Sequence, residues 1–156
     1  MAIKDYGLFK TSTIKGEKGT DWNIELYKKQ YVTLTENGQF TTNLNHWDFD
    51  VNFSWISNGG IGGLEISGGG DINQDLGNDL VGTFFVRVVV SNYSSGLISI
   101  HLGGQVHPTG IQSNGVHEFQ ITAGIVGNLI KLDCTIGCDM VIDQISVSQY
   151  QGYNYS

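Results

Sequence analysis

The sequence predicts an all-β protein, and three observations lead to that expectation. No segment keeps the 3.6-residue spacing of apolar side chains that an amphipathic helix requires. Short alternating or β-branched segments recur instead, separated by Gly, Asn and Ser. The 22 glycines beside a single proline indicate frequent turns in a folded chain of 156 residues. Roughly nine to eleven strands at turn spacings of about eight to twelve residues are typical of an antiparallel β-sandwich.

The clearest strand signals follow one another along the chain. They are residues 21–31, 52–57, 61–67, 83–91, 97–104, 115–124, 128–135 and 140–150. The first alternates Trp22, Ile24 and Leu26 with polar residues. The second and third surround a turn that starts at Asn58. The fourth is the strongest, because every second residue from Phe84 is apolar and shares one face.

The last strand contains the residues VIDQISV, and regular alternation has a consequence there. It places Val141, Asp143, Ile145 and Val147 on the face that should meet the core. A carboxylate in an apolar row is costly unless it is paired or hydrogen-bonded. Asp143 is therefore a candidate functional residue.

Composition divides the chain into three segments, residues 1–35, 36–149 and 150–156. Residues 1–32 hold six basic and four acidic side chains, a balance of +2, whereas the other 124 residues hold two basic and eleven acidic ones, a balance of −9. The pattern of residues 1–35 predicts a strand pair that is too small to be stable alone. We therefore expect this strand pair to pack on residues 36–149, on a sister subunit or on another protein. The last predicts a polar tail rather than a strand.

These features exclude several classes of partner. An acidic body repels phosphate backbones, so no nucleic acid is expected. The apolar runs are far too short for a membrane span, and no membrane partner is expected. The first ten residues lack a signal-peptide pattern, which favours synthesis in a cytoplasm. Cys134 and Cys138 are expected as free thiols, with pairing across a tight turn as the alternative.

Known chemical motifs are absent from the sequence. The glycine clusters near residues 59–70 lack the lysine and following helix of a phosphate loop. The four histidines show no zinc spacing, and no nucleophile motif occurs. The sequence therefore predicts a protein that is not an enzyme.

The order of signals after residue 36 resembles a known family. Asn37-Gly-Gln-Phe is followed by Trp47, by the hairpin-forming strands and finally by Ile142-Asp-Gln-Ile-Ser-Val. This pattern is similar to galactose-binding-like jelly-roll modules of the carbohydrate-binding type, and it covers residues 36–149. Gln39 and Gln144 depart from it, since the family has Asp and Asn there. The resemblance implies an antiparallel jelly-roll β-sandwich with a short N-terminal β-hairpin segment.

Modules of this kind are abundant in bacteriophage virion proteins, and residues 9–29 resemble the strand pair that opens many phage structural proteins. The two resemblances together imply a non-enzymatic virion structural protein, a capsid- or tail-associated decoration protein made in the host cytoplasm. Its partners would be other virion proteins, in several copies or as a homo-oligomer. The alternative is a carbohydrate-binding module whose main role is to recognise glycans, such as those of a cell surface.

The family resemblance also suggests site residues. In related modules the aspartate matching Asp143 helps to hold a structural calcium, and here Glu36 and Asn37 would supply further oxygen ligands. The alternative is a carboxylate that only accepts hydrogen bonds, and no other cofactor is required. For a glycan, Trp47 and Tyr93 are the candidate ligands because aromatic rings stack on sugars, whereas Trp55 is expected in the core.

The N-terminal segment supplies the expected assembly anchor. Its candidate residues are Lys10, Trp22, Ile24, Leu26 and Tyr27. The short strand pair needs a neighbour to bury Trp22, which favours association with other copies or other proteins.

Overall fold

The computed structural model describes residues 12–15, 21–24, 27–58, 61–124 and 127–155. Within these ranges every regular element is a β-strand, which confirms the all-β prediction. The same ranges contain no helix long and apolar enough to cross a membrane. The chain forms two compact units, residues 33–149 and residues 1–32 together with 150–156, and each is described by itself.

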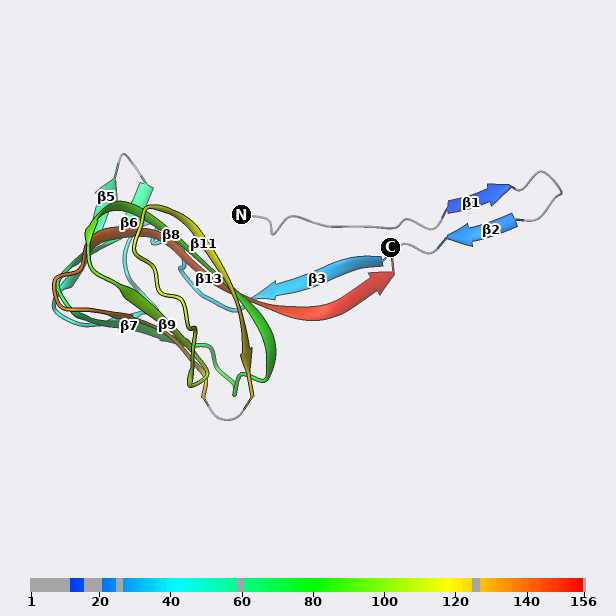
Figure 1. Ribbon diagram of the computed structural model, residues 1–156. Helices are drawn as coiled ribbons and strands as arrows, with labels where there is room; N and C mark the ends of the chain where they lie inside the picture. The colour runs from blue at the N-terminus through cyan, green and yellow to red at the C-terminus, as the bar shows by residue number, and fades with distance from the viewer. Residues whose placement is uncertain (1–11, 16–20, 25–26, 59–60, 125–126, 156) are drawn as a thin grey trace. The chain divides into compact units, whose positions relative to one another are not determined.

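The larger unit contains two sheets (Figure 1). The first, called the large sheet here, has the strand order β11-β8-β13-β6-β5 and antiparallel pairs throughout. Its strands are β11 (Gly115–Ala123), β8 (Gly82–Ser95), β13 (Asp139–Tyr155), β6 (Ile61–Ser67) and β5 (Phe53–Asn58).

The second sheet, called the small sheet, has the order β10-β9-β12-β7-β4 and is also antiparallel. Its strands are β10 (Gln105–Val106), β9 (Ile98–Leu102), β12 (Leu129–Cys134), β7 (Gly70–Asp75) and β4 (Asp48–Phe49). From β6 to β9 the chain passes from one sheet to the other at each step, and it does so again from β10 to β13. This repeated exchange is the jelly-roll β-sandwich that the sequence predicts.

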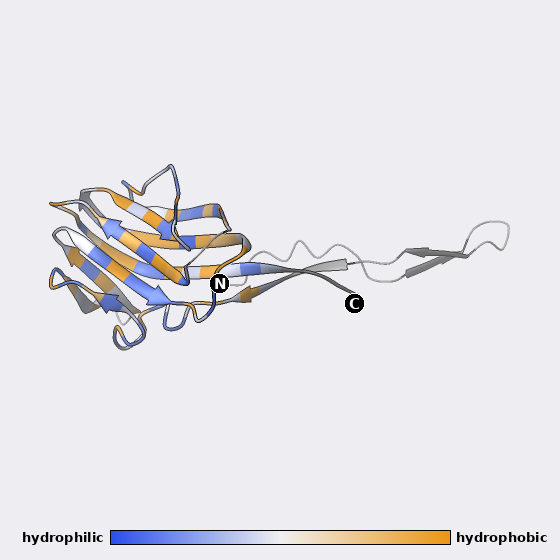
Figure 2. Cartoon of the chain, turned by 90° about the horizontal axis from the view of Figure 1, so that it is seen from below, coloured by the Kyte–Doolittle hydropathy of each residue, from blue (hydrophilic) through white to orange (hydrophobic). Residues whose placement is uncertain are grey.

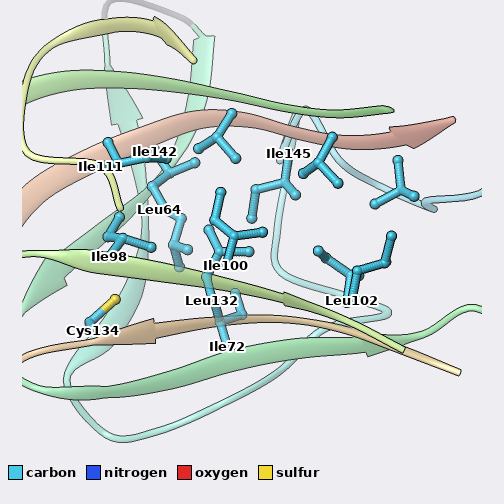
Figure 3. Close-up of a cluster of buried hydrophobic side chains, with 14 of the residues drawn as sticks. Leu64, Ile72, Ile98, Ile100, Leu102, Ile111, Leu132, Cys134, Ile142 and Ile145 are labelled. Atoms are coloured by element: carbon cyan, nitrogen blue, oxygen red, sulfur yellow. The ribbon is translucent and has the colours of Figure 1, made fainter. Parts of the chain in front are cut away.

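Apolar residues fill the space between the sheets. Hydrophobic and polar residues alternate along the sandwich strands (Figure 2), because neighbouring side chains of a strand point to opposite faces. In β8 the buried positions are Phe84, Val86, Val88 and Val90, as the period of two predicts. Side chains from the two sheets, among them Ile142 and Leu132, point toward one another in the interior (Figure 3).

The pairing of β13 with β8 is irregular at two points, and the one between Ile142 and Gln144 changes which side chains face the core. Ile142 is opposite Val90, but Gln144 is opposite Val89, so β13 has one extra residue there. This β-bulge makes Ile142 and Ile145 both fully buried, with two residues between them instead of one. Asp143 therefore does not share the core face with Ile145. The alternation expected from VIDQISV is right for Ile145 and Val147. It is wrong before the bulge, which reverses the facing: Ile142 belongs to the core cluster, whereas Val141 and Asp143 do not.

Two further differences concern elements that the sequence pattern does not reveal. Strand β7 is absent from the strand segments that the sequence predicts, since its Gly, Asp and Asn residues disfavour strands. The tail expected to be an extension continues β13 as far as Tyr155.

The smaller unit contains the remaining strands. β1 (Ser12–Lys15) pairs with β2 (Asp21–Ile24) in an antiparallel ribbon, which is the N-terminal hairpin that the sequence predicts. β3 (Tyr27–Thr33) pairs with β13. The rings of Tyr31 and Tyr150 lie 5.6 Å apart between their centroids.

Candidate functional site

A depression of about 400 Å³ lies on the outer face of the large sheet, the face turned away from the core. It is called the outer-face depression here. Its lining residues are Gln39, Thr41, Ile61, Gly62, Arg87, Val89, Asp143 and Gln144. They come from β6, β8, β13 and the loop that precedes β4. Ligand sites in proteins fall in the same range of volume.

The β-bulge in β13 gives the depression two of its polar groups. Because Ile142 and Ile145 both point into the core, Asp143 and Gln144 between them are both half-buried and both line the outer face. A regular strand would turn only one of two neighbouring residues outward. Bulges are over-represented beside functional sites because they redirect side chains in this way.

Close backbone contacts hold the loop at the rim of the depression. The Gly38 carbonyl accepts a hydrogen bond from the Ile145 amide at 2.7 Å, and a Cβ on Gly38 would overlap the Ile145 carbonyl. The Phe40 carbonyl accepts the indole N–H of Trp55 at 2.6 Å, and Gly62 leaves the space for that carbonyl. These contacts place Gln39 and Thr41 at the depression.

A buried glutamine secures the same loop from the other sheet. Gln74 in β7 is only 4% exposed and faces the inside of the sandwich. Its amide donates to the carbonyls of Glu36 at 2.8 Å and His46 at 3.1 Å, and its Oε1 accepts the Glu36 amide at 2.8 Å. The loop is thereby fixed to both sheets.

Arg87 in β8 is held before any ligand arrives. Its Nη1 donates to Gln144 Oε1 across the strand pair, and its Nε lies 3.4 Å from Glu118 Oε1. The Nε is buried and makes no hydrogen bond of good geometry, so Glu118 acts on it mainly as a charge. The guanidinium carries five N–H donors in all, and these contacts leave some of them for a bound molecule.

The carboxylate of Asp143 is held at one of its two oxygens. Its Oδ1 accepts a hydrogen bond from Ser91 Oγ at 3.1 Å. A Cβ placed on Gly63 would lie 3.0 Å from Val141 Cγ1 and 3.6 Å from Asp143 Oδ1, so the glycine leaves room beside the carboxylate. An ionised carboxylate has about four acceptor positions, and Ser91 uses one of them.

The depression combines hydrogen-bonding groups with a small apolar surface. Arg87 and Gln144 donate, Asp143 accepts, and Ile61 and Val89 offer aliphatic carbon. Among its lining residues Asp143 is the single carboxylate, and they include no His, Cys or Ser. The arrangement is suited to holding a polar molecule.

The aromatic residues expected to bind a glycan lie elsewhere. Trp47 is only 5% exposed, packs against Phe40 with ring centroids 5.7 Å apart and donates its indole N–H to the Asn37 carbonyl at 3.3 Å. A ring enclosed in this way has no free face for a sugar. Tyr93 belongs to β8 rather than to a turn, and it packs against the core with its hydroxyl donating to the Gly96 carbonyl at 3.1 Å.

Trp55 also differs from expectation. It is 37% exposed on the edge strand β5, not enclosed in the core. Its neighbour along the same face, Phe53, is buried.

The residues expected to bind calcium have separate side-chain partners. The carboxylate of Glu36 lies 2.8 Å from Nδ1 of His46, and the amide of Asn37 donates to oxygens of Asn43 and Asn45. Asp143 bonds to Ser91 instead. Within the described ranges no three His, Cys, Asp or Glu residues are grouped around a common metal position. These side-chain contacts do not assemble a calcium site, and calcium stays a prediction.

The expected anchor residues are only partly described. Trp22 and Ile24 lie in β2, and Tyr27 begins β3. Lys10 and Leu26 lie outside the described residues. The anchor role stays a prediction.

The two cysteines are buried free thiols. Burial raises the pKa of the Cys134 thiol, and the neighbouring Cys138 adds to the effect. Both residues pack as small core side chains, and the raised pKa makes Cys134 a poor nucleophile.

Sequence reasoning missed most of the outer-face depression. One signal was available, because Arg87 interrupts the most apolar strand and is one of only two basic residues after residue 32. The role of Gln144 depends on the bulge, and that of Gln39 and Thr41 depends on long-range loop contacts. No local pattern shows either feature.

Comparisons with solved structures give a likeness in fold, of which one of the matching chains is an example. No family model matches the sequence, and no curated protein matches it. A solved structure, TmCBM61 in complex with beta-1,4-galactotriose, is similar with 12% identity and a TM-score of 0.48. The match covers 74% of this chain and 97% of that chain. The fold assignment rests on the strand order of this chain itself.

Proposed function

We propose that the β-sandwich is a non-enzymatic carbohydrate-binding module and that the outer-face depression is its binding site. The depression is the observation that supports this proposal. Sugars present hydroxyl groups that both donate and accept, beside apolar C–H faces. Arg87, Asp143 and Gln144 offer matching donors and acceptors, and Ile61 and Val89 offer matching aliphatic surface.

The composition of the depression favours binding over hydrolysis. Most glycoside hydrolases use a pair of carboxyl groups on opposite sides of the scissile bond. Asp143 is the one carboxylate among the lining residues. Glu118 is directed to Arg87, which it approaches at 3.4 Å.

A glycan array tests this proposal. The protein should bind a subset of glycans, and Gln144→Ala should abolish the signal because it removes an amide and releases Arg87. Gln120→Ala is the matched control, since Gln120 is exposed on β11 of the same sheet but does not line the depression. An empty array, or equal loss in both variants, would reject the depression as a glycan site.

A second role, attachment to a larger assembly, is favoured by the separate terminal unit. Residues 1–32 and 150–156 form a compact unit of their own, and it contains the ribbon of β1 and β2. A two-stranded ribbon is marginally stable alone in water. Docking on another protein would supply the missing support, and it would display the sandwich in many copies.

We further propose that this assembly is a bacteriophage particle, with the chain as a capsid- or tail-associated decoration protein. The support is the resemblance of residues 9–29 to the strand pair that opens many phage structural proteins, together with the resemblance of residues 36–149 to jelly-roll modules that are abundant in virion proteins. Removal of residues 1–32 should leave a folded sandwich that no longer copurifies with particles. A truncated chain present at normal copy number in purified particles would reject the anchor, and a full-length chain missing from particles would reject the virion role.

A further inference from the structure

We infer that the outer-face depression selects an uncharged sugar, one of whose hydroxyl groups donates to Asp143 while a neighbouring oxygen accepts from Arg87 or Gln144. This inference rests on the proposed glycan-binding function and names the class of ligand. It differs from recognition of an acidic sugar, which an arginine in a binding site would otherwise favour.

The charge around the depression opposes an anionic ligand. Arg87 is the single cation of the lining, and Glu118 lies 3.4 Å from its Nε. Asp143 adds a second negative charge, so one positive and two negative groups give a local balance of −1. The acidic body adds a repulsive field for anions at longer range. A uronate, sulfate or phosphate group would meet no net positive site.

The hydrogen-bonding pattern fits adjacent hydroxyl groups. An ionised carboxylate only accepts, so its ligand must bring a donor, and a sugar hydroxyl does so whereas a carboxylate does not. Arg87 only donates, so its ligand must bring an acceptor oxygen. The side-chain amide of Gln144 stands beside both, and its Oε1 is already occupied by Arg87. An uncharged sugar satisfies donors and acceptors together.

The polar groups are fixed in advance, which reduces the entropy lost when a ligand binds. The bulge sets the direction of Asp143 and Gln144. Ser91 then holds Asp143 at 3.1 Å, and Gln144 holds Arg87. Ser91 does not line the depression, so it acts as a positioning residue for Asp143.

Matched pairs of trisaccharides test the inference. Each pair consists of a trisaccharide of a neutral sugar and the trisaccharide of the matching uronic acid: galactose with galacturonic acid, glucose with glucuronic acid, and mannose with mannuronic acid. Each compound is titrated into the full-length protein and its affinity is measured by calorimetry or NMR. We expect at least one neutral sugar to bind at least tenfold more tightly than its acidic partner. Asp143→Asn should weaken that binding at least tenfold. The exposed Asp48→Asn on β4 is the control and should leave it unchanged.

Each outcome has a distinct meaning. Equal or tighter binding of the acidic member would overturn the inference while leaving glycan binding intact. Unchanged affinity in Asp143→Asn would also overturn it. If no sugar in an array or in these pairs binds, the proposed function fails and the inference fails with it. Ser91→Ala is a second variant, and it should weaken neutral-sugar binding without changing the melting curve by more than a few degrees.

Discussion

The hydrogen bonds between Gln74 and the loop at the depression should contribute measurably to the stability of the protein. Replacement by leucine keeps a similar volume but removes three hydrogen bonds, two to Glu36 and one to His46. Each contributes about 1 kcal/mol net, so the gross loss is about 3 kcal/mol. The leucine regains part of this through apolar burial, and we expect a net loss of about 2 kcal/mol in the free energy of unfolding.

Urea unfolding and thermal melting measure that loss. For a chain of this size about 2 kcal/mol corresponds to a fall of roughly 4–8 °C in Tm. Asn73→Leu is the control, because Asn73 is the next residue of β7 and points outward with one hydrogen bond of 3.3 Å to Asp71. It should change the free energy of unfolding by no more than about 0.5 kcal/mol. Equal stability of Gln74→Leu and the wild type would refute the reasoning.

Three further predictions concern packing, calcium and the thiols. Gly38→Ala should destabilise the protein by about 1–3 kcal/mol in urea unfolding, because its Cβ would overlap the Ile145 carbonyl, whereas Gly124→Ala, with open space, should be nearly neutral. If calcium is bound, EDTA should lower the Tm by several degrees and added calcium should restore it; an unchanged curve would leave Asp143 to its hydrogen bond with Ser91. Cys134 should resist alkylation in the native protein and react fully in denaturant, because burial raises its pKa and excludes the reagent; fast native labelling would contradict this.

The fold could be predicted from the sequence because most of its strands and turns show patterns among residues that are close together in the chain. The period of two in residues 83–91 identifies β8, and the glycine-rich turns separate the other strands. Strand β7 lacks such a signal because only Ile72 is a buried apolar residue there. Its other buried position is Gln74, whose polar side chain is satisfied by distant backbone groups.

The candidate site could not be predicted in the same way. Aromatic side chains suggest sugar stacking, but whether a ring is exposed depends on packing across the sandwich. Trp47 is enclosed beside Phe40, whereas Trp55, expected in the core, lies half-open on an edge strand. Residue type alone does not distinguish these environments, since a tryptophan is suited to both.

The bulge in β13 connects the stability of the fold with the proposed function. In a regular strand either Asp143 or Gln144 would point into the core, and an unpaired carboxylate there would cost several kcal/mol. One extra residue lets Ile142 and Ile145 both fill the core while the two polar side chains turn outward. The same change brings Gln144 to Arg87 and Asp143 to Ser91. The bulge that keeps the carboxylate out of the core therefore also assembles the polar groups of the depression. A change in the register of β13 would alter both the position and the polar groups of the depression.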